Sequence, residues 1–116
     1  MGKGQVVVMG SYVADLAFRT EKLPAWGETY MGAGFKLGPG GKGSNQAVAA
    51  ARAGAQVSFI SKLGRDAFGD IARNTYRDEV IDATYVLETD SPTGGGDHHR
   101  CSEGRERHHR RAGCLL

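Results

Sequence analysis

The chain is organised around the stretch Gly38-Pro39-Gly40-Gly41-Lys42-Gly43-Ser44-Asn45-Gln46-Ala47, a glycine-rich turn that runs into a predicted helix. Glycines allow positive φ and a close approach of the backbone to a ligand. A helix that begins here directs free N–H groups and the positive end of its dipole at the turn. Lys42 adds a cation, and Asn45 adds an amide that both donates and accepts hydrogen bonds. The stretch suits a polyhydroxylated or anionic ligand, and a plain glycine-rich connection is the alternative.

The segments around this turn alternate between strand and helix patterns. Residues 5–10 and 56–63 are apolar, β-branched runs that fit buried parallel strands, and residues 84–87 begin another strand. Residues 43–53 form an alanine-rich helix, and residues 67–79 form an amphipathic one. This β-α-β-α-β succession predicts a doubly wound α/β sheet.

Two residues mark helix ends in this pattern. Gly54 follows the first helix and is expected to stop it, because glycine adopts the left-handed conformation that ends many helices. Asp66 precedes the second helix and is expected to cap its first turn.

Two short segments, residues 16–19 and 28–36, have the pattern of strands outside the central sheet. Gly32 and Gly34 interrupt the second segment, and such short, glycine-broken strands seldom lie in a buried sheet. We therefore expect a side sheet or flap. Trp26, in the turn between the two segments, is expected to anchor packing rather than to form a platform for substrate.

Asp15 is the candidate ligand-binding carboxylate. It follows the first predicted strand, and open α/β sheets bind ligands beyond the C-terminal ends of their strands. A carboxylate in that place accepts hydrogen bonds from substrate hydroxyls. A turn or capping aspartate is the alternative.

The composition of the chain changes near residue 94. Residues 1–93 hold equal numbers of basic and acidic side chains, so the net charge of +2 comes from residues 94–116, which also hold all four His and both Cys. No apolar run approaches the ~20 residues of a membrane span, and no signal peptide is recognisable. We expect a soluble, cytoplasmic protein without a disulfide framework.

Residues 5–94 resemble the N-terminal part of the ribokinase/phosphofructokinase-B family of carbohydrate kinases. The resemblance rests on four motifs that stand in order: Gly10-Ser11-x-x-Ala14-Asp15, Pro24-x-x-Gly27-Glu28-Thr29, Gly40-Gly41-Lys42-Gly43-Ser44-Asn45-Gln46-Ala47 and Gly64-x-Asp66-x-x-Gly69. It implies that residues 1–94 form the beginning of a three-layer, doubly wound α/β domain. A small β lid is expected over the sugar site, and in this family the lid often forms a homodimer interface.

The resemblance also implies an activity, in which the γ-phosphoryl group of ATP is transferred to the 5-hydroxyl of ribose. Mg²⁺ is required in the intact family, and a monovalent cation activates. The expected partner is therefore a small sugar, ribose or a related one, with no nucleic acid and no membrane. Because the family's nucleotide site is C-terminal, no ATP or metal is expected to bind to this fragment.

The family's sugar site maps onto matching positions of this chain. Asp15 is expected to hold sugar hydroxyls, while Lys42 and Asn45 bond to sugar oxygens. The expected substrate-binding set is Val13, Ala14, Asp15, Gly41, Lys42, Gly43, Ser44 and Asn45. No catalytic residue is expected, because the family's base and anion hole come from a downstream Gly-Ala-Gly-Asp segment that these 116 residues lack. The truncated chain is thus expected to be inactive, leaving residual sugar binding or pairing through the lid as the alternative function.

Two positions depart from the family pattern. Val13 stands where family members that phosphorylate ribose commonly have Asn, so one amide contact is missing and the identity of the sugar is open. Val80 stands where a glycine is expected to close the second helix, at a modest cost in stability because a β-branched residue resists the left-handed region.

The tail has two interpretations. His98, His99, Cys101, His108, His109 and Cys114 are potential zinc ligands, but their spacing matches no common zinc module. The repeated His-His-Arg can instead arise from codons that encode Ile-Ile-Val after a shift of one base. We therefore hypothesise that residues 95–116 are an out-of-frame translation that is disordered, in preference to a zinc site or a basic nucleic-acid-binding arm.

Overall fold

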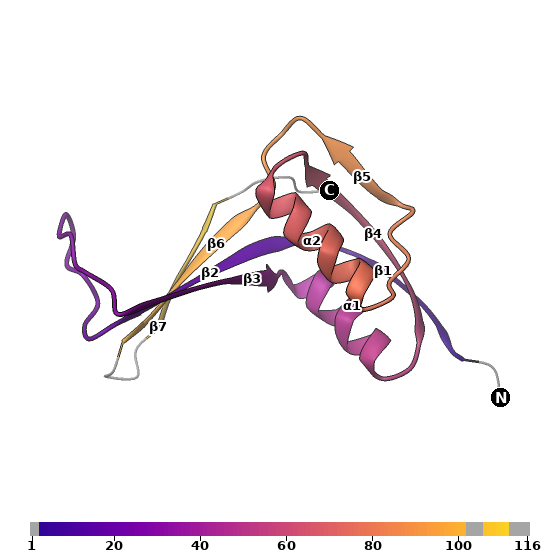
Figure 1. The fold of residues 1–116 in the computed structure, drawn as a ribbon, viewed down its shortest axis with the longest axis horizontal. Helices are drawn as coiled ribbons and strands as arrows, with labels where there is room; N and C mark the ends of the chain where they lie inside the picture. Colours follow the sequence, from indigo (N-terminus) through magenta and orange to yellow (C-terminus); the bar gives the residue numbers. More distant parts are fainter. Residues whose placement is uncertain (1–2, 102–105, 112–116) are drawn as a thin grey trace.

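Two β-sheets share the chain in the computed structural model, which describes residues 3–101 and 106–111 and the side chains of residues 3–96 (Figure 1). The elements in chain order are β1 (Gln5–Met9), β2 (Val13–Thr20), β3 (Gly34–Gly40), α1 (Lys42–Arg52), β4 (Gln56–Gly64), α2 (Ala67–Asp78), β5 (Val86–Thr89), β6 (Gly95–Cys101) and β7 (Glu106–Arg111). We call the sheet β1-β4-β5 with its two helices the body, and the sheet β3-β2-β6-β7 the side sheet.

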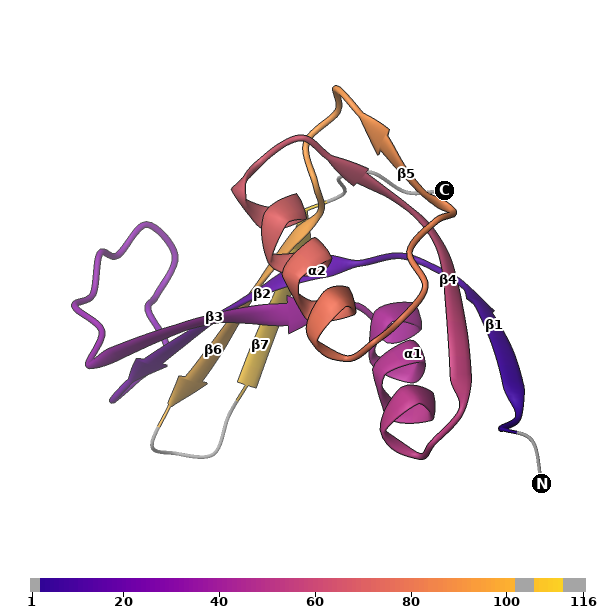
Figure 2. The ribbon, with the colours of Figure 1, turned by 45° about the vertical axis from the view of Figure 1, so that its right-hand side comes forward.

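The body confirms the predicted parallel α/β arrangement. β4 lies in the centre and pairs in parallel with β1 on one side and with β5 on the other. The chain passes from β1 to β4 and then from β4 to β5, each time to the next strand on the same side of the sheet. The helices α1 and α2, which precede β4 and β5, lie side by side on one face of this sheet (Figures 1 and 2). The alternation of burial along β4 follows from this cover, because its side chains point alternately to the helices and away from them.

The core lies between the helices and the body sheet. Phe59 on β4 and Tyr76 on α2 are almost wholly buried, and their rings meet edge to face at 5.1 Å. Ala47 on α1 and Ala72 on α2 face the same core, where small side chains allow close packing of helix on sheet. The buried hydrophobic residues are Tyr12, Ala14, Ala47, Val57, Phe59, Leu63, Ala72, Tyr76 and Ile81.

The helix ends follow the expected signals. α1 is followed by Gly54 at φ 98°, in the region that favours glycine. The Asp66 carboxylate caps α2 by accepting a hydrogen bond of 2.8 Å from the backbone N–H of Gly69. Val80 stands at φ 56° just after α2, so a β-branched residue does occupy a left-handed position there.

The side sheet confirms that these strands lie outside the body, but its boundaries differ from those predicted. The expected strand over residues 28–36 is wrong in position, since β3 covers Gly34–Gly40 and so includes most of the predicted glycine-rich turn. β3 pairs antiparallel with β2, with Pro39 opposite Ala14. Proline is accommodated because β3 is the edge strand of its sheet.

The tail pairs with the side sheet, which corrects the expectation of disorder at residues 95–101 and 106–111. β6 lies parallel to β2, and β7 lies antiparallel to β6. The tail can pair in this way because β2 is bonded to β3 on one side only, which leaves backbone N–H and C=O groups on its other side. These groups can bond to an extended segment whatever its side chains are. Composition predicted little burial for the tail and did not anticipate this backbone pairing.

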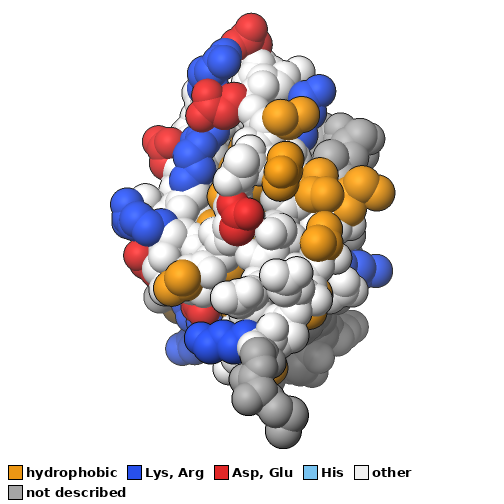
Figure 3. All heavy atoms as spheres, turned by 90° about the vertical axis from the view of Figure 1, so that its right-hand side faces the viewer, with side chains coloured by type: hydrophobic (Ala, Val, Ile, Leu, Met, Phe, Trp, Pro, Cys, Tyr) orange, Lys and Arg blue, Asp and Glu red, His pale blue; other side chains and the backbone are white. Residues whose placement is uncertain are grey.

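Several large hydrophobic side chains are exposed. Trp26, expected to anchor packing, is 105% exposed on the connection between β2 and β3, so that expectation is wrong. Val7 and Met9 on β1 and Leu87 on β5 are also exposed, and hydrophobic side chains gather on the face of the molecule that Figure 3 shows. None of the helices in the described ranges is both long enough and apolar enough to span a membrane.

Candidate functional site

Asp15 lies within strand β2 rather than in the loop that the sequence suggested. Its neighbours across the sheet are Gly38 on β3 and Gly96 on β6. Residues in register on adjacent strands share one face of a sheet, so glycine on both sides leaves the half-buried Asp15 carboxylate with no flanking side chain. One oxygen of this carboxylate, Oδ1, is buried.

The glycine-rich turn packs directly against the chain that leads into β2. A Cβ placed on Gly41, which has φ 93°, would lie 2.7 Å from the carbonyl oxygen of Ser11. A Cβ on Gly43 would lie 2.8 Å from the Cα of Gly10, and one on Gly40 would lie 3.2 Å from the Cβ of Asp15. These contacts require glycine, and they bring the start of α1 beside β2.

The N-terminus of α1 adds hydrogen-bond donors at the same place. Gly41 is the N-cap residue, no side chain caps the helix there, and no acidic residue lies in its first turn. The backbone N–H groups of the first turn have no partner within the helix, and the helix dipole adds partial positive charge there. The side chains of Lys42 and Asn45 are exposed on this turn, so cationic, amide and backbone donors are grouped together.

Two of the predicted site residues are buried in the structure. Ala14 is completely buried, and its N–H donates to the carbonyl of Gly94 at 2.8 Å. Ser44 is 1% exposed, and its Oγ lies 3.1 Å from the phenolic oxygen of Tyr76. Val13 is half-buried, pairs with Gly40, and offers an apolar surface where an amide would add a donor and an acceptor.

Two buried tyrosines lie beneath this region. Burial raises the pKa of Tyr76 to about 12, so its phenol remains protonated at neutral pH. Burial, together with the nearby Tyr76 and Asp15, raises the pKa of Tyr12 further. The two rings meet edge to face at 6.4 Å, and no residue in the described part of the chain bonds to the Tyr12 hydroxyl.

Sequence reasoning missed Tyr76 and the flanking glycines Gly38 and Gly96. Tyr76 is 32 residues from Ser44, and nothing local in the sequence of α2 signals their contact. Gly96 falls in the segment expected to be disordered, so its position beside Asp15 depends on the β2–β6 pairing. Only the three-dimensional arrangement brings these residues to the site.

The sequence raised two metals, Mg²⁺ through the family resemblance and zinc through the tail. Among residues 3–96, whose side chains the structure describes, no three His, Cys, Asp or Glu side chains are grouped as metal ligands would be. The zinc alternative rests on six side chains of the tail, which lie outside the side chains that the structure describes.

Known proteins resemble this chain over most of its length. Residues 3–96 match the family described as pfkB family carbohydrate kinase. Ribokinase of Bacillus subtilis is 39% identical over 85% of this chain and 34% of its own, and deoxyribokinase of Salmonella typhimurium is 39% identical over 78% of this chain and 29% of its own. Arabidopsis thaliana ribokinase, solved with ribose and ATP, superimposes with a TM-score of 0.86 at 31% identity over 98% of this chain and 37% of its own. The chain thus spans about a third of the length of these relatives.

Proposed function

The chain belongs to the pfkB family of carbohydrate kinases, and we propose that its residues 1–94 form the sugar-binding part of an enzyme that phosphorylates ribose. The observation that carries the proposal is the arrangement around Asp15. A half-buried carboxylate, whose neighbours across the sheet are both glycines, lies on the strand against which the uncapped start of α1 packs. Grouped acceptors and donors of this kind match the alternating hydroxyls of a sugar.

Each proposed contact follows from the chemistry of the group. The Asp15 carboxylate accepts hydrogen bonds from two sugar hydroxyls, Lys42 donates to a sugar oxygen, and Asn45 donates and accepts. Gly41 and Gly43 let the backbone come close to the sugar. Ala14 and Ser44 are buried, so their proposed part is to support the site from within the core.

Val13 bears on which sugar is bound. An apolar side chain there cannot bond to a hydroxyl, so the site loses one polar contact relative to an amide. Ribose remains the proposed substrate, and 2-deoxyribose, the sugar in the name of one relative, is the comparison that tests the role of Val13.

We propose that the 116-residue chain by itself does not transfer phosphate. Phosphoryl transfer depends on positioning and charge stabilisation around both the nucleotide and the acceptor, and the chain spans only about a third of its relatives. In the intact kinase, bound ATP supplies the phosphoryl group, and the residues proposed here bind and orient the sugar. Formation of ribose 5-phosphate by the purified chain, above a control without protein, would refute this proposal.

Calorimetric titration of ribose into the 116-residue chain tests the sugar site. We expect saturable binding that weakens by at least about tenfold in Asp15→Asn, since a charged acceptor of hydrogen bonds is lost. Asp70→Asn is the matched control, because Asp70 is an exposed aspartate on α2 that forms an ion pair with Arg73 of the same helix. Absence of binding to ribose and 2-deoxyribose, or equal binding by Asp15→Asn, would contradict the proposal.

Pairing through the side sheet is the second candidate function. Trp26, Met31, Phe35 and Leu37 are exposed on β3 and on the connection that precedes it. Exposed hydrophobic side chains in such number are typical of interaction surfaces. Light scattering across a concentration series, comparing the chain with Phe35→Ser, measures whether this surface forms dimers.

We also propose that residues 95–116 are read out of frame. The shifted frame replaces polar strands with Ile-Ile-Val runs in a hairpin, and β6 and β7 form a hairpin at this place, with His98 opposite His108. Sequencing the gene across the codons for residues 91–96 tests the proposal. An additional or missing base supports it, and an intact reading frame refutes it.

A further inference from the structure

A buried hydrogen bond ties the start of α1 to α2. The Oγ of Ser44 lies 3.1 Å from the hydroxyl of Tyr76, and each residue is 1% exposed. Either hydroxyl can donate. Because water does not reach the pair, each hydroxyl depends on the other for its hydrogen bond. The two helices that it joins pack side by side in Figure 2.

Ser44 sits where this bond can act on the proposed sugar site. It is the third residue of α1, next to Asn45 and two residues after Lys42. No side chain caps the first turn, so its place is set by the close packing of the glycines and by the bond to Tyr76. A helix start without a cap otherwise frays readily.

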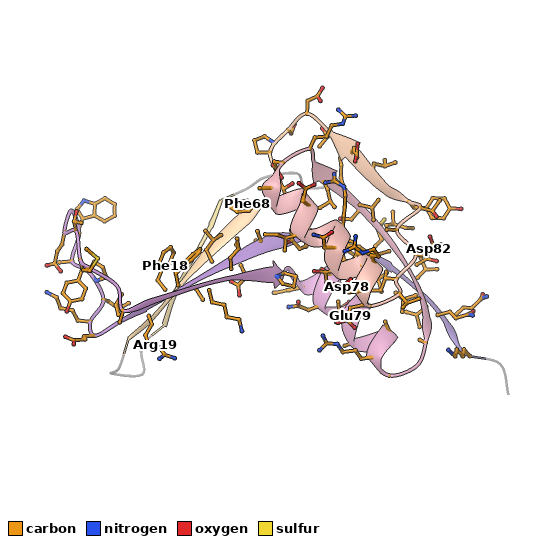
Figure 4. All side chains as sticks on the ribbon, in the orientation of Figure 1. Phe18, Arg19, Phe68, Asp78, Glu79 and Asp82 are labelled. Atoms are coloured by element: carbon orange, nitrogen blue, oxygen red, sulfur yellow. The ribbon has the colours of Figure 1, made fainter. Side chains whose placement is uncertain are left out.

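The other tie between the helices lies at the far end of α1. Arg52 bonds to Glu79, which follows α2 and is labelled with Asp78 at the end of that helix in Figure 4. The Arg52 side chain is 70% exposed. The Glu79 side chain is 21% exposed. Because the pair lies at the last residue of α1, it does not hold the first turn, where the buried bond lies.

We propose that Tyr76 is a positioning residue of the sugar site: through Ser44 it holds the first turn of α1, with Lys42 and Asn45, in place relative to Asp15 on β2. This inference rests on the proposed function, because it concerns the same sugar site. Tyr76 does not contact the sugar, and its effect passes through the Ser44 hydroxyl.

Tyr76→Phe isolates the hydroxyl from the ring. The ring packs against Phe59 at 5.1 Å and Tyr12 at 6.4 Å, and phenylalanine retains both contacts. The variant leaves the buried Ser44 hydroxyl without a partner, an unfavourable state that it can escape by displacing the first turn. Adding Ser44→Ala removes the orphaned hydroxyl, so the double variant is expected to recover part of the loss.

Ribose titration of the 116-residue chain is the first test. We expect the Kd of Tyr76→Phe to rise about tenfold, and that of the double variant to fall back toward the unmodified chain. Tyr12→Phe is the matched control, since it removes a buried hydroxyl to which no described residue bonds. Glu79→Gln is a second control, since it weakens the ion pair between Arg52 and Glu79 at the other end of α1. Both are expected to leave the Kd unchanged. If Tyr76→Phe lowers only the melting temperature while the ribose Kd stays constant, its role is structural and the proposal is overturned.

Hydrogen exchange without ligand separates this inference from the proposed function. The amide of Asn45 donates to the carbonyl of Gly41 at 2.9 Å, and the amide of Ala53 donates to Ala49 at 3.0 Å at the other end of α1. We expect Tyr76→Phe to accelerate exchange at Asn45 about tenfold and to leave Ala53 unchanged. Equal effects at both amides, or none at Asn45, overturn the inference.

The two tests fail in different ways. If the unmodified chain binds no ribose, the proposed function fails, and exchange at Asn45 still decides whether Tyr76 holds the first turn. Ser44→Ala, which leaves Tyr76 without its partner, is expected to loosen the same amide and provides the measurement if Tyr76→Phe does not fold.

Discussion

The body and the side sheet are stabilised in different ways. In the body, two helices cover one face of a parallel sheet, and side chains such as Phe59 and Leu63 are completely buried. In the side sheet, strands pair extensively through their backbones, yet Phe35 and Leu37 on β3 are 59% and 40% exposed. Backbone pairing alone leaves apolar surface in water, so most of the stability of the chain should come from the body.

The proposed sugar site lies where these two regions meet. β2 begins at the core, with Ala14 fully buried, and continues into the exposed side sheet, where Phe18 packs against Phe35 at 5.1 Å (Figure 4). Asp15 therefore lies near the start of β2, directly after the buried Ala14. The rest of β2 pairs with β3 and β6 in the side sheet.

The strongest test of this comparison removes one phenyl ring from each region. Phe59→Ala is expected to lower the free energy of unfolding by about 3–5 kcal/mol, because it leaves a cavity in the core. Phe35→Ala is the matched change in the side sheet, and its expected cost is below about 1 kcal/mol because the ring is already largely in water. Urea unfolding measures both. Equal losses would show that the side sheet carries as much stability as the body.

Asp66 links the two regions, and its removal should have the next largest effect. Its carboxylate caps α2 through Gly69 and accepts the N–H of Thr93 at 2.7 Å, just before β6. Asp66→Ala is expected to lower stability by about 2 kcal/mol at pH 7. Asp70→Ala, in the first turn of the same helix, is the control and should cost less, since its ion pair with Arg73 is exposed at the aspartate.

The effect of Asp66 should also depend on pH. Burial raises the pKa of its carboxyl, but hydrogen bonds from Thr93 and Gly69 lower it more, so the pKa in the folded chain lies below its ordinary value. A lowered pKa stabilises the fold above the unfolded-state value near pH 4, and this is lost as the pH falls through the folded-state value. Melting temperatures of the unmodified chain and Asp66→Ala should therefore converge in acid. A constant gap from pH 7 to pH 2 would contradict this.

A smaller gain in the body is expected from Val80→Gly. Val80 has φ 56°, which is unfavourable for a β-branched residue, and its side chain is 86% exposed, so burial does not offset this backbone strain. Glycine removes the strain and loses some backbone entropy, for a net stabilisation of about 1 kcal/mol. Gly54→Ala is the converse change, at φ 98° with no atom close to the added Cβ, and should destabilise. Thermal unfolding of the two variants should shift in opposite directions.

The smallest expected effect lies in the connection between β2 and β3. Lys22 forms an ion pair of 3.0 Å with Glu28 and lies 5.1 Å from the centre of the Tyr30 ring. The pair is largely exposed, so Lys22→Gln should change stability by less than about 0.5 kcal/mol, and by still less in high salt. A loss comparable to that of Asp66→Ala would mean that this connection is part of the cooperative unit.

The sequence predicted the body well because its signals are local. Apolar runs, an alanine-rich helix, Gly54 and Asp66 each act within a few residues, and the structure places elements where these signals predict them. The resemblance to the family rested on four motifs in order, of which the run from Gly40 to Ala47 is one. Even the strained position of Val80 followed from the sequence, because the helix must end there.

The tertiary structure alone decided how the site is built. β3 was misplaced because the pairing that forms it depends on β2, and the strands of the tail depend on the free edge of that same strand. The same holds for the glycines beside Asp15 and for the bond between Ser44 and Tyr76, which joins residues 32 positions apart. Local sequence determines which helices and strands form. Contacts between distant segments are decided only in the folded chain, because strands must pair along their edges and buried polar groups must form hydrogen bonds there.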